Sequence, residues 1–181
     1  MQTLKIPQER VAVLIGASGC TKKKIEKAMK VKLQVDREGE VDLTSKDPVA
    51  EWRSMQIVQA IGRGFSPERA FKLVGEDYYL KIIDLRELLR NEKEIERIKG
   101  RIIGEKGRTR LVIEETSSAC VCVYGHTVAL IGKLDEVALA ERAIEKLMEG
   151  AMHATVYKML ERGRREMNES RRVLWEEKKK E

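Results

Sequence analysis

Two short glycine motifs contain the residues best suited to binding a ligand. IGASG covers Ile15–Gly19, and IGEKG covers Ile103–Gly107. Glycine has no side chain, so it permits positive φ angles and lets a ligand approach the backbone closely. A helix that starts after such a motif presents free N–H groups and a partial positive charge, which suit an anion such as phosphate. The motifs therefore predict two sites for a phosphate-bearing chain.

Positive charge is concentrated beside both motifs. The basic side chains are Lys22, Lys23 and Lys24 after the first motif, and Lys106, Arg108 and Arg110 in and after the second. The whole chain has a net charge of +6 and a pI of about 9.2, which favours a polyanionic partner. A nucleotide-binding P-loop is excluded, because Thr21 and Thr109 stand where its second glycine is needed. The alternative is a glycine-mediated helix crossing that binds no ligand.

The two motifs belong to an internal repeat with a spacing of 88 residues. The spacing that aligns the two motifs also aligns further residues without a gap: Ile15 with Ile103, Gly16 with Gly104, Gly19 with Gly107, Ile25 with Ile113, and Val35 with Val123. Because chance rarely matches glycines and apolar positions together, the repeat predicts two copies of one small domain.

Each copy has the same predicted order of elements: strand, helix, helix, strand, strand, helix. The first copy has strands at Thr3–Ile6, Val31–Val35 and Val41–Thr44, and helices at Arg10–Leu14, from the motif to about Met29, and from Pro48 to about Ile61 with Asp47 as cap. The second has strands at Leu80–Leu85, Cys120–Tyr124 and Thr127–Ile131, and helices at Glu92–Ile103, Arg108–Thr116 and Glu136–Met148, the last capped by Asp135. A short helix follows Ser66, and residues 153–181 form a basic helical tail, either a solvated helix or an arm that contacts nucleic acid.

Composition argues against a disulfide framework, a metal site and a catalytic centre. The three cysteines are an odd, sparse set, and Cys120 and Cys122 have no second pair nearby. Neither His126 nor His153 stands in a motif with a nucleophile or a metal ligand, and the carboxylates are scattered. We therefore expect no cofactor, no metal and no enzymatic activity. The sparse cysteines, together with the lack of a long apolar run and of a signal-peptide pattern, predict a cytoplasmic protein. We also expect a monomer.

At its glycine motifs the chain resembles proteins with two KH domains. Ile15–Gly19 and Ile103–Gly107 match the KH loop, which clamps the backbone of about four single-stranded nucleotides. The resemblance implies an α+β fold of two tandem type I (eukaryotic-type, βααββα) KH domains. Each would have a three-stranded antiparallel sheet packed against three helices, and a C-terminal helix would follow. We predict a first domain with linker helix at 1–75, a second domain at 76–152 and the tail at 153–181.

Three stretches narrow the resemblance to the Pno/Dim family of ribosome-assembly factors. Gly100–Gly132 resembles the family's second KH domain, Phe65–Glu87 the linker of its archaeal members, and Met152–Glu161 the segment after the last KH helix. The resemblance implies binding near the 3′ end of small-subunit ribosomal RNA, with a Nob-type endonuclease and the α subunit of initiation factor two as partners. Eukaryotic relatives tend to have lost the first loop, but Gly16 and Gly19 are present here.

The resemblance also assigns the RNA-binding residues. They are Ile15, Gly16, Ala17, Ser18, Gly19, Lys22 and Lys23 in the first copy, and Arg101, Ile103, Gly104, Glu105, Lys106, Gly107, Arg108 and Arg110 in the second. Bases would lie against the isoleucines and the strands that follow. The alternative function is a protein-interaction scaffold that binds RNA weakly or not at all. Its partner surface would be built from aromatic side chains that otherwise pack the domains together, namely Trp52, Phe65, Phe71, Tyr78 and Tyr79.

Overall fold

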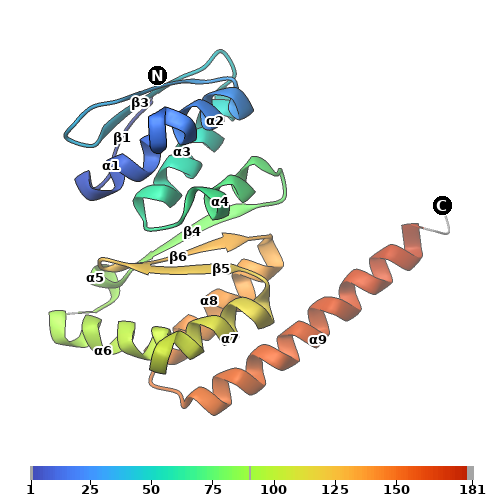
Figure 1. Ribbon diagram of the computed structural model, residues 1–181. Helices are drawn as coiled ribbons and strands as arrows, with labels where there is room; N and C mark the ends of the chain where they lie inside the picture. Colours follow the sequence, from blue (N-terminus) through green and yellow to red (C-terminus); the bar gives the residue numbers. More distant parts are fainter. Residues whose placement is uncertain (1, 90, 179–181) are drawn as a thin grey trace. The chain divides into compact units, whose positions relative to one another are not determined.

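The computed structural model describes residues 2–89 and 91–178 (Figure 1). The described residues up to Ile83, together with Cys122–Ile131, form one compact unit. Those of Asp84–Val121 and from Gly132 onward form a second unit. This division by contacts does not follow the repeat, because strands of the second copy group with the first unit. The domain boundaries at residues 75 and 152 stay predictions.

The first copy of the repeat folds in the predicted order. Its elements are β1 (Gln2–Lys5), α1 (Gln8–Ile15), η1 (Ala17–Gly19), α2 (Cys20–Met29), β2 (Lys32–Val35), β3 (Glu40–Thr44) and α3 (Pro48–Gly62). The strands pair antiparallel in the order β1-β3-β2, with Leu33 opposite Leu43 on the two neighbouring strands. Helix α3 packs on β1 and β3, and α1 and α2 pack against α3. The helices thus cover one face of this sheet (Figure 1).

Sequence signals account for the position of α3 and for the core beneath it. The Asp47 carboxylate accepts a hydrogen bond of 2.9 Å from the Val49 N–H, and Pro48 occupies the first helical position, as predicted. Alternate residues of β2 and β3 point inward because side chains in a strand have a period of two. The fully buried side chains of this copy are Leu14, Ile25, Leu33, Val41, Leu43, Ile57, Val58 and Ile61.

The second copy repeats the order after a short linker. The linker holds α4 (Pro67–Ala70) and η2 (Phe71–Val74), and the copy holds β4 (Tyr79–Asp84), α5 (Leu85–Leu88), α6 (Glu92–Ile103), η3 (Glu105–Gly107), α7 (Arg108–Ser117), β5 (Cys120–Tyr124), β6 (Thr127–Gly132) and α8 (Leu134–Met148). Its sheet has the order β4-β6-β5, so both sheets place the third strand between the first and the second. The predicted fold class, with two three-stranded antiparallel sheets, helices and a C-terminal helix, is confirmed. The short helix α5 was not predicted, and the glycine loops, predicted as loops between helices, contain the short 3-10 helices η1 and η3.

The start of α8 differs from the prediction. Asp135 lies inside the first turn, because the helix begins at Leu134. The side chain that satisfies the helix start is that of Glu136, which accepts a 3.0 Å hydrogen bond from the Lys133 N–H. Asp135 instead accepts a hydrogen bond from the Glu136 N–H. Either acidic residue suits a helix start, so the sequence alone did not decide between them.

The tail is the helix α9 (His153–Lys178), and its first turns are anchored in the second unit. Val156 and Leu160 are buried, and α9 packs against α7 and α8. Further along, the Arg171 guanidinium donates hydrogen bonds of 2.8 Å to Asp135 and 3.0 Å to Glu136, both at the start of α8. The tail is therefore helical as predicted, and Arg171 ties its distal half to the same unit.

An arginine braces the carboxyl end of α3. Arg10 on α1 donates from Nε to the Ile61 carbonyl oxygen at 2.8 Å and from Nη2 to the Phe65 carbonyl oxygen at 2.6 Å. The last carbonyl groups of a helix have no partner within the helix, and a cation interacts favourably with them. Arg10 therefore links α1, the helix that precedes the first glycine loop, to the carboxyl end of α3.

Candidate nucleic-acid interface

The two glycine loops have the same backbone conformation. Gly16 has φ 73° and ψ 174°, and Gly104 has φ 72° and ψ 176°. Within the loops Ser18 has φ 52° and ψ 28°, and Lys106 has φ 50° and ψ 28°. Non-glycine residues seldom adopt such positive φ angles, so a shared value at matching positions is a strong sign of a common structure. The 88-residue repeat in the sequence is thus a repeat in backbone conformation.

The first glycine of each loop is required by packing within the protein. A Cβ atom on Gly16 would overlap the Thr21 side chain and lie 2.9 Å from the Thr21 nitrogen. A Cβ atom on Gly104 would likewise overlap the Thr109 side chain and lie 2.8 Å from the Thr109 nitrogen. Both threonines are buried, and they are also 88 residues apart. Sequence reasoning did not select these threonines, although their spacing was a signal that could have found them.

The second glycine of each loop faces open space. A Cβ atom on Gly107 would meet nothing within 4 Å, and one on Gly19 would meet only the flexible Lys23 side chain at 4.0 Å. Both residues have positive φ, 78° and 75°. The backbone is therefore bare of side chains at the start of α2 and of α7, where a sugar–phosphate chain could approach it.

Some of the loop amides are used inside the loops. The Gly19 N–H donates to the Gly16 carbonyl oxygen, and the Gly107 N–H donates to the Gly104 carbonyl oxygen, both at 3.2 Å. The first amide of α2, that of Cys20, donates to the Ala17 carbonyl oxygen. These bonds hold each loop in its shape before any ligand arrives. These amides are therefore less available to a ligand than the sequence predicted.

The predicted phosphate-contacting side chains differ in how accessible they are. Lys23, Lys106 and Arg108 are exposed, as are Ala17, Ser18 and Glu105 in the loops themselves. Lys22 is half-buried, and so is Arg110, whose Nε atom is buried without a hydrogen-bond partner among the described residues. Of the two predicted base-contacting residues, Ile103 is 37% exposed and Ile15 is half-buried. Among the predicted RNA-binding residues, the exposed cations are thus Lys23, Lys106 and Arg108.

Arg101 has contacts that favour a structural role. Its Nε donates to the Leu147 carbonyl oxygen at 3.1 Å, and its Nη2 donates to the Ala151 carbonyl oxygen at 2.5 Å. Arg101 thus braces the end of α8 as Arg10 braces the end of α3, but from a different place in the repeat. Its predicted contact with phosphate would compete with these bonds and stays a prediction.

The Arg101→Ala variant is expected to lose about 2 kcal/mol in the free energy of unfolding, because two carbonyl groups lose a charged donor. Arg108→Ala is the matched control, with an expected loss below about 0.5 kcal/mol, because Arg108 is exposed. Denaturant unfolding of both variants measures the difference. Unchanged stability of Arg101→Ala together with weakened RNA binding would instead assign Arg101 to the ligand.

Tyr124 ends β5, one of the strands predicted to lie against bases, and its side chain is bonded within the first unit. Its hydroxyl donates to the Glu9 carboxylate, and the Arg10 guanidinium lies 5.8 Å from its ring centroid. Burial and the hydrogen bond to Glu9 raise the pKa of Tyr124 above its usual value. The hydroxyl therefore stays protonated and bonded, which favours the structural interpretation of Tyr124 over base stacking.

The aromatic residues of the predicted partner surface are not equally exposed. Phe65 is buried, Phe71 and Tyr78 are half-buried, and Trp52 and Tyr79 are 46% and 44% exposed. Phe65 is thus part of the core. Trp52 and Tyr79 are the members of this set with the most surface available to a protein partner.

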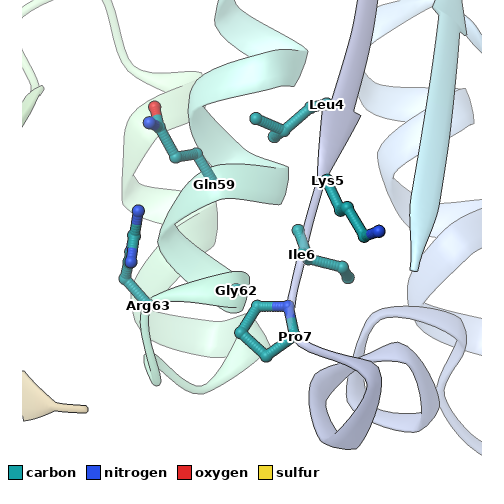
Figure 2. A pocket seen from close by; sticks show the side chains of 7 residues that line it. All are labelled: Leu4, Lys5, Ile6, Pro7, Gln59, Gly62 and Arg63. Carbon is teal, nitrogen blue, oxygen red and sulfur yellow. The ribbon is translucent and has the colours of Figure 1, made fainter. Parts of the chain in front are cut away.

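A separate cavity of about 290 Å³ lies in the first unit, away from the glycine loop. Figure 2 shows its lining residues, which come from β1, the residues after it and the end of α3: Leu4, Lys5, Ile6, Pro7, Gln59, Gly62 and Arg63. A Cβ atom on Gly62 would lie 2.8 Å from the Ile6 side chain, so this glycine serves the close packing of α3 on β1. None of the predicted RNA-binding residues lines this cavity.

Other kinds of site are not found in the part of the chain that the structure describes. Among residues 2–89 and 91–178, no group of three or more histidine, cysteine, aspartate and glutamate side chains could hold a metal ion. None of the three cysteines forms a disulfide bond. No helix of these residues is both long enough and apolar enough to cross a membrane.

Both copies of the repeat match known protein families. Residues 1–51 match the KH domain, and residues 79–165 match the eukaryotic-type KH domain, KH-domain type I. KH domain-containing protein MJ0443 of Methanocaldococcus jannaschii is 46% identical over 98% of this chain and 80% of its own length. Pre-rRNA-processing protein pno1 of Aspergillus fumigatus is 29% identical over 61% of this chain, and the match spans 45% of that protein.

A solved structure extends the similarity to the fold. The crystal structure of the a/eIF2alpha-aDim2p-rRNA complex from Pyrococcus horikoshii OT3 contains a chain that is 51% identical to this one. The match covers 91% of this chain and 94% of that chain, with a TM-score of 0.85. The glycine loops described above lie within a fold that is thus similar to that of a protein crystallised with RNA.

Proposed function

Because the chain belongs to the Pno/Dim family of KH-domain proteins, we propose that it binds single-stranded RNA as an assembly factor of the small ribosomal subunit. The observation that carries the proposal is the pair of glycine loops with one backbone conformation. In each, the second glycine leaves the backbone open at the start of a helix, with exposed lysine or arginine beside it. That arrangement fits the KH mode of binding, in which the loop clamps the backbone of about four nucleotides.

Among single-stranded RNAs, ribosomal RNA is the proposed target. The names of the relatives support it, since one is a pre-rRNA-processing protein and another was crystallised in a complex with rRNA. We place the binding near the 3′ end of the small-subunit rRNA, where the protein would assist endonucleolytic maturation. The intact first loop supports binding by both KH domains, because its conformation equals that of the second.

Protein partners follow from the same comparison and from the family. The α subunit of initiation factor two is proposed as a partner, because the complex from Pyrococcus horikoshii contains it beside the related chain. The Nob-type endonuclease is proposed from the family resemblance alone. Trp52 and Tyr79 offer exposed aromatic surface for such partners. A scaffold without RNA binding is the alternative, and it would leave the duplicated loop conformation without a role.

We propose no catalytic step for the chain itself. The related proteins are described as RNA-binding and pre-rRNA-processing proteins with KH domains. Cleavage of the RNA would be the work of the endonuclease. The proposed location is the cytoplasm.

Crosslinking the full chain to cellular RNA and mapping the sites tests the proposal. Crosslinks are expected to concentrate at the 3′ end of the small-subunit rRNA. On the protein, they are expected at the two glycine loops and the lysines and arginines that follow. Crosslinks spread over many unrelated messenger RNAs would instead indicate a general RNA-binding protein. Crosslinks absent from both loops would favour the scaffold.

A further inference from the structure

A second hollow lies beside the second glycine loop, within the second unit. Its volume is about 370 Å³, and it is lined by residues of α6, the loop, α7 and α9. Among them are Arg97, Gly100, Glu105, Arg108, His153 and Tyr157. Because α9 lies outside the βααββα order of a KH domain, this hollow is a feature that the C-terminal helix adds.

Two arginines that line the hollow, Arg97 and Arg108, are exposed. Arg97 pairs only loosely with Glu94, at 3.7 Å, and its side chain is 67% exposed. Arg108 is exposed and lines the same hollow, whereas Arg101, which also lines it, has its guanidinium bonded to the Leu147 and Ala151 carbonyl oxygens. One carboxylate, that of Glu105, opposes the two remaining arginines, Arg97 and Arg108. The net charge of the lining therefore favours an anion, and planar guanidinium groups suit phosphate in particular.

Two aromatic side chains of α9, His153 and Tyr157, also line the hollow and are bonded to α6 and α7. The Tyr157 hydroxyl lies 3.0 Å from Thr109 Oγ1, and Thr109 is the buried residue that packs under Gly104. His153 Nε2 lies 3.0 Å from the Arg101 carbonyl oxygen, so this nitrogen carries the hydrogen and donates it. The two rings are 6.2 Å apart and tilted by 60°. These bonds hold both aromatic side chains in place relative to the loop.

Helix α6 leaves room for a ligand at one of its residues. A Cβ atom on Gly100, which lines the hollow, would meet nothing within 4 Å. The volume lies at the low end of the range for sites that hold a small molecule, about 300–1,000 Å³. One nucleotide fits such a space, whereas a folded protein segment needs a larger surface.

We propose that this hollow binds one further nucleotide of the RNA strand that the second loop clamps. This inference rests on the proposed function. The phosphate lies between Arg97 and Arg108, and the sugar and base lie against Tyr157. Arg108 belongs to both sites, because it follows the loop directly and also lines the hollow. The strand therefore continues from the loop toward α9, and the C-terminal helix lengthens the binding site beyond the four nucleotides of a KH loop.

The test compares a four-nucleotide RNA with the same RNA extended by three nucleotides at either end. Fluorescence anisotropy with the full chain gives the affinity for each. One of the two extensions is expected to bind about tenfold more tightly than the four-nucleotide RNA, because a stacked base and a phosphate contact are added. Arg97→Ala is expected to abolish that gain. It is also expected to make binding of the longer RNA less dependent on salt. The slope of log affinity against log salt concentration should fall by about the amount that one phosphate contact contributes.

Arg165→Ala is the matched control, because Arg165 is also exposed and lies on α9 outside the hollow. This variant has the same net charge as Arg97→Ala and is expected to keep the gain from the extension. Equal melting temperatures of both variants would show that neither change unfolds the protein. The proposal is overturned if neither extension binds more tightly, or if Arg97→Ala keeps the gain. Absence of binding to all three RNAs would instead overturn the proposed function itself, and this inference with it.

Discussion

Replacing Gly104 with alanine is expected to lower the free energy of unfolding by about 3 kcal/mol. Its φ of 72° and ψ of 176° lie in a region that is almost restricted to glycine. The added Cβ would also overlap the Thr109 side chain and lie 2.8 Å from the Thr109 nitrogen. That nitrogen belongs to the backbone of α7, so it cannot swing aside as the tip of a long side chain does. Denaturant unfolding measures the loss.

Gly107→Ala is the matched control in the same loop. Its φ of 78° and ψ of 9° are left-handed, a conformation that costs other residues about 1 kcal/mol, and nothing lies within 4 Å of the added Cβ. A loss about one-third of that of Gly104→Ala is expected. Gly16 and Gly19 should reproduce the same contrast in the first loop. Equal losses at the two glycines of one loop would contradict the division of roles proposed for them.

Placing aspartate at both variable positions of both loops is expected to weaken RNA binding about 30-fold. The changes are Ala17→Asp, Ser18→Asp, Glu105→Asp and Lys106→Asp, which together make the net charge more negative by four. Aspartate tolerates the positive φ of Ser18 and Lys106 better than most residues do, so the loops should keep their conformation. Fluorescence anisotropy with a single-stranded RNA at fixed salt gives the affinity.

The fold of this variant is checked separately from its binding. Its melting temperature is expected to stay within a few degrees of that of the unchanged protein, because all four side chains are exposed. A variant with aspartates on α9, at Arg164 and Arg165, has the same change in net charge and serves as the control for charge alone. If both variants bind RNA equally well, the loops are not where RNA binds, and the scaffold becomes the better explanation.

The elements around both loops could be predicted because their signals are local. Glu92–Ile103 and Cys120–Tyr124 were predicted with the bounds that the structure has, and Asp47 caps α3 as expected. One glycine motif of this kind could occur by chance, but its recurrence in the repeat made it a strong signal. Each of these features depends on residues close together in the sequence, whose conformational preferences are strong.

The features that could not be predicted depend on distant residues. Arg101 reads as a basic residue beside a motif, and only the fold brings it to the carbonyl groups of Leu147 and Ala151. The same holds for the hollow at Arg97, to which α9 contributes Tyr157. A sequence shows which side chains carry charge, but not which groups compete for that charge after folding.

The braces at Arg10 and Arg101 do not occupy equivalent places in the repeat. Shifted by 88 residues, Arg10 corresponds to Ile98 and Arg101 to Val13, and Ile98 is buried. The two halves therefore stabilise the end of their last helix from non-equivalent positions of the repeat. In a hybrid with α1 in place of α6, the charged side chain of Arg10 would occupy the buried position of Ile98. The two halves are therefore not interchangeable.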